Sequence, residues 1–255
     1  PIFSAITREY GIKFDLKVAQ SYNAVVEGMV NDKVDIAWFG PVSYHQAKER
    51  GVAQLLAVGV SNNESVYYSG IFTRKDSGLK SLADLKGQSV AFGDINSTSS
   101  FNFPVAMLLE AGLDPVRDLG EIHLTGSHAN AMAALDAGRV DAACASYSSF
   151  EKAVGNGQID PAEIVPLAKS DPIPYPPMAM HVTLDESLKK TLREAFNNVH
   201  LAKGITPDMV RGYGGKKIDR YNADYSEAEF DKAMSKLAVV TDELKAEMIK
   251  KASDQ

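Results

Sequence analysis

The sequence is poor in the residues that build covalent or metal frameworks. Among its 255 residues there is one cysteine, Cys144, and there are five histidines. A single cysteine excludes an intrachain disulfide and a cysteine-based metal cluster, and it leaves the redox compartment open. No apolar run approaches the roughly 20 residues that a membrane-spanning helix needs. There is no N-terminal secretory signal either, so we expect a chain that is either cytoplasmic or already processed.

Basic charge and enzyme motifs are scarce as well. The 27 Lys and Arg are outnumbered by 33 Asp and Glu, and no basic run stands out, which argues against a nucleic-acid partner. A small anion is not excluded, because oriented N–H groups act locally. The sequence contains no G-x-S-x-G, Walker loop or H-E-x-x-H motif. We expect Cys144 to be a buried structural thiol, and we expect no catalytic residue, no metal and no cofactor. Four histidines are scattered along the chain and are not spaced like metal ligands: His45, His123, His181 and His200.

What the chain does have is an alternation of short apolar strands and helices. This alternation predicts an α/β fold with open sheets, largely parallel in the first half, and helices on both faces. The predicted helices are 1–10, 24–31, 42–50, 104–111, 129–137, 185–200, 226–237 and 241–252; the predicted strands are 12–19, 34–39, 54–60, 66–73, 89–92, 121–124, 140–144 and 178–182. An α/β domain normally opens on a strand, so we expect a leading strand to be missing ahead of the first helix.

A restart of this pattern after the polar turn at 74–78 predicts two lobes. Residues 29–37 loosely match 135–143, each with a helix, a turn and a Val-Asp strand, although helix-turn-strand units also look alike by chance. The proline-rich stretch 170–177 cannot be a helix or a central strand, so we interpret it as a connection between lobes. We predict lobe 1 over 1–73, lobe 2 over 74–175, and a return to lobe 1 over 176–255, whose C-terminal helices pack on that lobe.

The most informative stretch follows the strand 89–92. After Gly93, four hydroxyl residues, Ser97-Thr98-Ser99-Ser100, stand where a helix should begin. Ser and Thr are strong N-cap residues, and a helix start with its unpaired N–H groups can hold an anion. Taken alone, the stretch is explained equally well as a helix cap with spare serines. His128 follows Thr125-Gly126-Ser127 at a second strand end, where ligands of open α/β sheets bind.

Aromatic residues of the first lobe, and of the segment that leaves it, are further candidates. Tyr22 lies just ahead of a helix, and its hydroxyl can donate to an anion, although a structural role is equally consistent. Of Tyr67 and Tyr68, only one can face a cleft, because neighbours in an extended chain point to opposite sides. Trp38 ends a short strand, and there we favour a plug of the lobe over a wall for a ligand.

These motifs together resemble a known family. The segments Tyr22-x4-Glu27-Gly28-Met29, 33–41, 93–99 and 126–131 occur in the order found in the phosphonate/phosphite-binding proteins of ABC importers. That family belongs to the bilobed, type II periplasmic substrate-binding proteins, and the resemblance covers about residues 1–223. It implies two open mixed sheets flanked by helices, with a ligand cleft between the lobes. It implies a leading strand, a permease partner in the inner membrane, and a monomer that is periplasmic or anchored through an N-terminus not present here.

The same resemblance implies how a phosphorus oxyanion is held between the lobes. By motif match, the hydroxyls and N–H groups of Ser97, Thr98 and Ser99 hold its oxygens, and His128 adds a donor. Tyr22 and Tyr67 close the site from the other lobe. Several neutral donors and a histidine can satisfy three charged oxygens without a lysine or arginine.

The chain departs from the family pattern where aminoalkylphosphonate-binding members carry acids. The corresponding stretches here are 145–148 and 174–176, and neither aligned position is acidic; Asp171 is several residues off. A buried ammonium without a counter-charge is costly. We therefore expect a ligand without an amine, phosphite first and methylphosphonate second, with Tyr147 and Tyr175 filling the space of an aminoalkyl chain. Alternatives are other phosphonates, sulfonates or sulfate, a sensor domain, or an enzyme on the same scaffold.

Overall fold

The computed structural model describes all 255 residues, and the chain separates into two compact units. Unit 1 comprises Pro1–Val66 and Pro174–Lys232, and unit 2 comprises Tyr67–Ile173 and Ala233–Gln255. The divisions fall at 66/67 and 173/174, where the sequence predicted 73/74 and 175/176. The two crossing segments, β3 (Val66–Tyr67) and β9 (Ile173–Pro174), pair with each other, and the third crossing lies within α8 (Ala228–Ser235).

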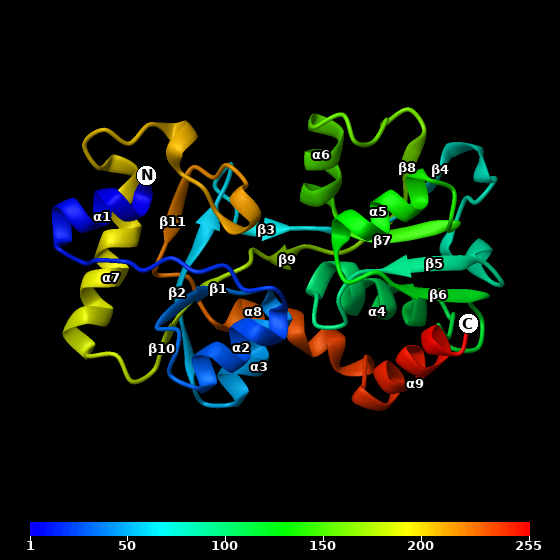
Figure 1. Ribbon diagram of the computed structural model, residues 1–255, viewed down its shortest axis with the longest axis horizontal. Coiled ribbons are helices and arrows are strands. Elements are labelled where there is room, and N and C mark those ends of the chain that lie inside the picture. The colour runs from blue at the N-terminus through cyan, green and yellow to red at the C-terminus, as the bar shows by residue number, and fades with distance from the viewer. The chain divides into compact units, whose positions relative to one another are not determined.

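Unit 1 is built around a four-stranded sheet of order β1-β10-β2-β11 (Figure 1). Its strands are β1 (Ile36–Trp38), β2 (Ala53–Val60), β10 (Met178–His181) and β11 (Arg220–Asn222); its helices are α1 (Ile2–Tyr10), α2 (Tyr22–Val30), α3 (Pro41–Glu49) and α7 (Glu186–Asn198). Every neighbouring pair is antiparallel, so the predicted largely parallel order is wrong for this sheet. β1 and β2 run in the same direction, but β10 returns from far along the chain and inserts between them.

Neighbouring residues of the strands serve two apolar cores, one on each face of the unit 1 sheet; the alternation is strict in β1 and β10. Leu56 faces a core that includes Phe196 of α7 and the buried side of α1. Its neighbour Leu55 faces the other core, with Met29 of α2 and the buried side of α3. This alternation is the period of two that a strand covered on both faces requires.

The segment 12–19 was predicted as a strand and is not one. It alternates apolar and polar residues, but it forms no ladder with any strand of the sheet. Leu16 is 65% exposed and Val18 is 98% exposed. A strand is stable only when its N–H and C=O groups pair with a neighbour, which is a tertiary condition that the pattern cannot supply.

Unit 2 contains a mixed five-stranded sheet of order β6-β5-β7-β4-β8. Its strands are β4 (Ser69–Arg74), β5 (Ser89–Phe92), β6 (Glu121–Leu124), β7 (Ala142–Ser146) and β8 (Ile164–Lys169); its helices are α4 (Phe103–Glu110), α5 (His128–Asp136), α6 (Tyr147–Gly155) and α9 (Asp242–Ser253), and a π-helical turn, η3, spans Thr98–Asn102. β5 is parallel to β6 and β7, whereas β4 is antiparallel to β7 and β8. No element was predicted for α6 or β8.

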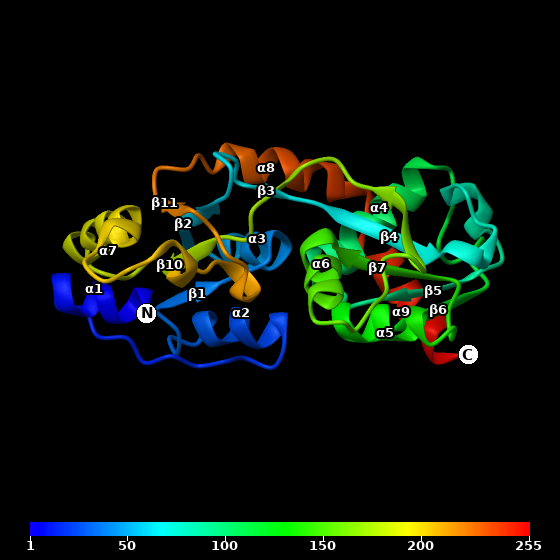
Figure 2. The same cartoon turned by 90° about the horizontal axis from the view of Figure 1, so that it is seen from above.

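The two faces of the unit 2 sheet are covered by different helices (Figure 2). Ala91 and Phe72 belong to the core shared with α5 and α6. Phe92, one residue on from Ala91, faces the opposite side and packs on Phe101 of η3 with ring centroids 5.6 Å apart. The segment that enters α4 therefore lies on one face, and α5 and α6 lie on the other.

The internal match between 29–37 and 135–143 has a structural counterpart. Asp32 and Gly138 occupy the same place in the match, and both have a positive φ, 55° and 65°. Each lies in the turn between a helix and a short strand, α2 to β1 in unit 1 and α5 to β7 in unit 2. A left-handed residue suits glycine and is tolerated by aspartate, so the two turns solve the same geometric problem with different residues.

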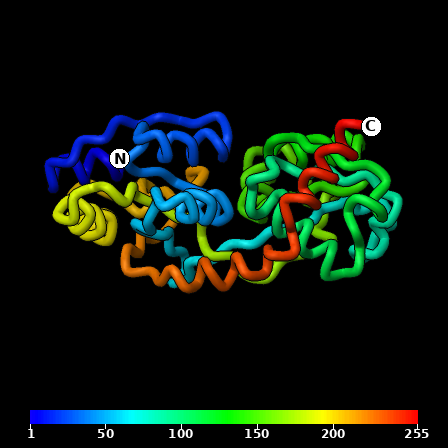
Figure 3. The backbone as a smooth tube through the Cα atoms, turned by 90° about the horizontal axis from the view of Figure 1, so that it is seen from below, coloured from blue at the N-terminus to red at the C-terminus, as the bar shows by residue number.

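The last helix belongs to unit 2, although the C-terminal helices were expected to pack on the first lobe. In Figure 3 the red C-terminal segment runs along the green and cyan coils of unit 2. Lys251 donates to the carbonyls of Val116 and Leu119 at 2.8 and 2.5 Å, and Gln255 accepts from the N–H of Ile122. No helix in the structure is both long enough and apolar enough to cross a membrane.

Candidate functional site

Five strand ends meet at one edge of the unit 2 sheet. β5, β6 and β7 are parallel, β4 runs against them, and β8 runs against β4. The carboxyl ends of β5, β6, β7 and β8 therefore share an edge with the amino end of β4. The segments leaving this edge are the Ser-Thr-Ser turn, the loop before His128, the start of α6 at Tyr147 and the residues around Lys169. Ligands of open α/β sheets bind at such edges.

The turn after β5 is held by its own polar groups. Ser97 is the N-cap residue of η3, and its hydroxyl accepts from the N–H of Ser100 at 3.2 Å. The Asn102 side chain donates to the carbonyls of Ile95 and Ser97 at 3.0 and 2.9 Å. The sequence therefore folds here as predicted, into a capped helix start with N–H groups at its first turn. Such a start attracts an anion.

The end of β5 can lie close against Ser100 of the turn because residue 93 is a glycine. Its N–H donates to the carbonyl of Ser100 at 3.0 Å, and a Cβ added at Gly93 would lie 2.2 Å from the Ser100 hydroxyl oxygen. That hydroxyl is fully buried and has no hydrogen-bond partner. On the β4 side, the Ser69 hydroxyl donates to the carbonyl of Ser99 at 2.7 Å. The turn is thus fastened to both β5 and β4.

His128 is the first residue of α5, and one hydrogen bond defines its tautomer. The N–H of Ser146 donates to His128 Nδ1 at 3.0 Å, so in the neutral ring Nε2 carries the proton. Nε2 lies 3.4 Å from the hydroxyl oxygen of Ser97, which places the N–H at the Ser-Thr-Ser turn. Burial lowers the pKa of His128 to about 4 from its ordinary 6.5, so the ring is neutral near pH 7.

The resulting cluster offers neutral donors to an anion. Ser97, Thr98 and Ser99 are each at most 4% exposed, and their hydroxyls accompany the N–H groups of the helix start. The Nε2–H of His128 adds a further donor. Donors that are already oriented and desolvated bind an anion strongly because little reorganisation is needed. No group of three or more His, Cys, Asp or Glu is arranged to hold a metal ion.

The structure distributes the other predicted residues over the two units. Tyr147 opens α6 in unit 2, half-buried, with its ring 5.3 Å from that of Phe72. Tyr67 is 7% exposed in β3. Tyr22 opens α2 in unit 1 and is half-buried. Unit 2 therefore brings together Ser97 and His128, with Tyr147 directly following the residue that bonds the imidazole.

Two of the predicted aromatic residues pack inside unit 1. Trp38 ends β1, and its ring packs edge-on against Phe3 beside the core, with ring centroids 5.6 Å apart. Tyr175 is 5% exposed and lies against Gly59 and Gly212 in the same core. Burial raises the pKa of Tyr175 to about 12.

Sequence reasoning missed the residues that support this cluster from other strands. Ser146 supplies the N–H that orients His128, and Ser69 fastens the turn. Neither lies near the turn in sequence. Only the pairing of β4 with β7, which matches Ser69 with Ser146, reveals them.

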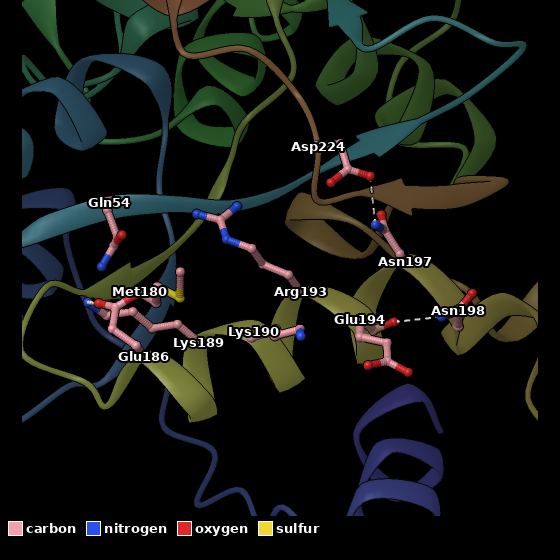
Figure 4. A pocket seen from close by; sticks show the side chains of 10 residues that line it. All are labelled: Gln54, Met180, Glu186, Lys189, Lys190, Arg193, Glu194, Asn197, Asn198 and Asp224. Carbon is pink, nitrogen blue, oxygen red and sulfur yellow. Dashed lines mark hydrogen bonds and ion pairs between the residues drawn. The ribbon is translucent and has the colours of Figure 1, made fainter.

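A surface groove of unit 1 lies elsewhere and contains none of the predicted site residues. It has a volume of about 580 Å³ and runs along α7 (Figure 4). Arg193 at its floor donates to the carbonyls of Leu55 and Ala223 at 2.6 and 2.9 Å, and Asn197 donates to Asp224. The side chains of Arg193 and Asn197 therefore already have hydrogen-bond partners within the protein. We assign the groove a structural role, in which these bonds hold α7 against the sheet.

Comparison with known proteins identifies relatives over most of the chain. The profile of a family described as "ABC transporter, phosphonate, periplasmic substrate-binding protein" matches residues 1–218. The phosphonates-binding periplasmic protein of Escherichia coli is 29% identical over 82% of this chain and 62% of its own length. The phosphate-import protein of Mycolicibacterium smegmatis is 28% identical over 77% of this chain and 64% of its own length. The chain thus spans somewhat under two thirds of these curated relatives.

Solved structures of low sequence identity share the fold. A methylphosphonate complex of a protein from Prochlorococcus marinus has a TM-score of 0.79 at 19% identity, covering 93% of this chain and 90% of the other. The binding-protein component of an ABC phosphonate transporter from Pseudomonas aeruginosa has a TM-score of 0.73 at 21% identity, covering 99% and 90%. Both are phosphonate-type binding proteins, so the predicted bilobed type II α/β fold with open sheets is confirmed.

Proposed function

Because this chain belongs to the phosphonate family of periplasmic substrate-binding proteins of ABC transporters, which are not enzymes, we propose that it captures a small phosphorus oxyanion for an ABC permease. Phosphite is the first choice of ligand and methylphosphonate the second. The observation that carries the proposal is the neutral His128, whose Nε2–H is directed by Ser146 toward the capped Ser-Thr-Ser turn.

The remaining contacts of the proposed site come from the other unit and the crossing segment. Tyr22 and Tyr67 would donate to the oxyanion when the protein closes around it. Closure around a bound solute is the usual response of two-unit binding proteins, in which the ligand stabilises the closed state. The proposed setting is periplasmic, with the protein acting as a monomer that delivers its ligand to the permease.

The chemistry around the site disfavours a ligand that carries an ammonium. Ala145, Ser146 and Tyr147 stand where a counter-charge would be needed, and none is acidic. The nearby Asp171 is already paired with Lys236. Tyr147 would limit the room for a substituent, which supports phosphite or methylphosphonate.

Phosphate is the second candidate ligand, because one relative, 28% identical, is named a phosphate-import protein. Phosphite has a non-ionisable hydrogen where phosphate has a fourth oxygen. A site built for three oxygens leaves that fourth oxygen unpaired and therefore rejects phosphate. If instead a donor meets the fourth oxygen, phosphate binds at least as tightly as phosphite.

Isothermal titration calorimetry with phosphite, methylphosphonate, 2-aminoethylphosphonate, phosphate and sulfate tests the proposal. We expect phosphite to bind most tightly. The substitution His128→Ala removes the Nε2–H donor. It should weaken phosphite binding about 10- to 100-fold, which corresponds to the free energy of one hydrogen bond to a charged group. His123→Ala is the matched control, because His123 is an exposed histidine of the same unit that pairs with Glu121.

Three results would contradict the proposal. Tightest binding of 2-aminoethylphosphonate would mean that an acid reaches the ammonium after all. Equal losses in the His128 and His123 variants would remove the imidazole from the site. Absence of binding by all five anions would mean that the family relationship describes the fold and not the ligand.

A further inference from the structure

Lys169 lies at the same edge of the unit 2 sheet as the Ser-Thr-Ser turn, and it has no acidic partner. It is the last residue of β8, it is exposed, and no carboxylate forms an ion pair with it. Its ammonium instead lies over the ring of Tyr68, 3.7 Å from the centroid, and 5.1 Å from the centroid of Tyr147. A lysine packed on phenol rings and without a carboxylate partner can still form an ion pair with an anion.

The register of the sheet explains why these three side chains meet. Lys169 is paired with Gly70 of β4, so their side chains face the same way, and Tyr68 precedes Gly70 by two residues on the same face. Gly70 has no side chain to occupy this space. A Cβ there would lie 2.6 Å from the Phe72 ring and 2.9 Å from the Tyr147 ring. The glycine thus lets Tyr147 settle over β4, within reach of the Lys169 ammonium.

The strand order places Lys169 on the far side of Tyr147 from the oxyanion donors. His128 and the Ser-Thr-Ser turn follow β6 and β5, Tyr147 follows the next strand, β7, and Lys169 ends β8, two strands further on. Neighbouring strands are about 4.8 Å apart, so the strand order separates Lys169 from the oxyanion donors, and a ligand substituent that extended past Tyr147 would approach its ammonium.

We propose that Lys169 makes this site discriminate between larger phosphonates by the charge of the substituent, so that, behind the small ligands proposed above, it prefers a phosphonate carrying an anionic group such as a carboxylate to one carrying an ammonium. The inference rests on the proposed function and refines its substrate class. A carboxylate would draw the ammonium from the Tyr68 ring into an ion pair, and a charged pair is stronger than a cation–π contact. An ammonium at the same place would meet a like charge.

The test compares phosphonoacetate, methylphosphonate and 2-aminoethylphosphonate by calorimetry in the wild type and in Lys169→Gln. We expect the substitution to weaken phosphonoacetate binding about tenfold, as for loss of one charge-assisted contact, and to change methylphosphonate binding less than about threefold. Lys80→Gln is the matched control, because Lys80 is exposed in the same unit and its loss changes the net charge equally.

Charge reversal provides a second variant with an opposite expected result. Lys169→Glu should bind 2-aminoethylphosphonate about tenfold more tightly than the wild type does and should lose affinity for phosphonoacetate. Equal losses for methylphosphonate and phosphonoacetate in Lys169→Gln, or an unchanged phosphonoacetate affinity, would overturn the proposal. Failure of the wild type to bind any phosphorus oxyanion would overturn the proposed function itself, and this inference with it.

Discussion

At the scale of single residues, His128 illustrates how burial and one backbone hydrogen bond set the properties of a side chain. The backbone N–H of Ser146 donates a hydrogen bond to Nδ1 of His128, and burial lowers the pKa of the ring to about 4. The ordinary pKa is 6.5, so between these two values the unfolded chain binds a proton that the native chain does not. The free energy of unfolding should therefore fall as the pH is lowered from about 6.5 to about 4.

The size of this effect can be measured by urea denaturation at several pH values between 7.5 and 4.5. His128 should contribute a loss of about 2–3 kcal/mol between pH 7.5 and 4.5, because its pKa is about 4 in the native protein and 6.5 ordinarily. His128→Gln cannot take up the proton, so its stability should fall less steeply over the same range. The difference between the two curves isolates His128 from other groups, including His200, whose pKa is also lowered by burial. Parallel curves would show that His128 is not buried as a neutral ring.

At the scale of elements, the start of η3 depends on the absence of a side chain at Gly93. Gly93→Ala would place a methyl group 2.2 Å from the Ser100 hydroxyl, and the turn would have to shift. We expect a loss of about 1–3 kcal/mol in the free energy of unfolding, typical of overpacking, together with weaker oxyanion binding. Urea denaturation and calorimetry measure the two effects.

A second substitution and a control make this prediction specific. Ser100→Ala removes the clashing oxygen and should restore part of the stability and affinity lost in Gly93→Ala. Gly155→Ala is the control, because nothing lies within 4 Å of a Cβ there and it should be neutral or slightly stabilising. If Gly93→Ala behaved like Gly155→Ala, the close packing of β5 against the turn would be excluded.

At the scale of the whole molecule, the C-terminal helix α9 is assigned to unit 2. Met248 is fully buried in α9, whereas its neighbour Ile249 is 38% exposed. Met248→Ala should destabilise the protein by about 2–4 kcal/mol because it leaves a cavity, and Ile249→Ala should have little effect. Amide hydrogen exchange locates the damage. We expect faster exchange in β6 and its neighbours, whereas faster exchange confined to the unit 1 sheet would contradict the assignment of α9.

Much of the local structure could be predicted because its causes are close together in the sequence. Gly11 ends α1 in a left-handed conformation, and Ser21 and Ser127 cap α2 and α5. The hydroxyl turn after β5 forms the predicted helix start for the same reason, since Ser97 and Ser100 are near neighbours. Its role in binding an oxyanion stays a prediction until ligands are titrated.

Other features depend on residues that only the tertiary structure brings together. The insertion of β10 between β1 and β2, the absence of a strand over 12–19, and the place of α9 in unit 2 follow from long-range pairing and burial. The tautomer of His128 is set by a hydrogen bond from the N–H of Ser146, which lies on another strand. The proposed role of Lys169 depends on its position beside Tyr147, which the sequence does not show. The sequence by itself determined caps, turns and the type of most elements, because those interactions span a few residues. Register and side-chain environment were decided by the fold, because pairing energy depends on partners distant in the chain.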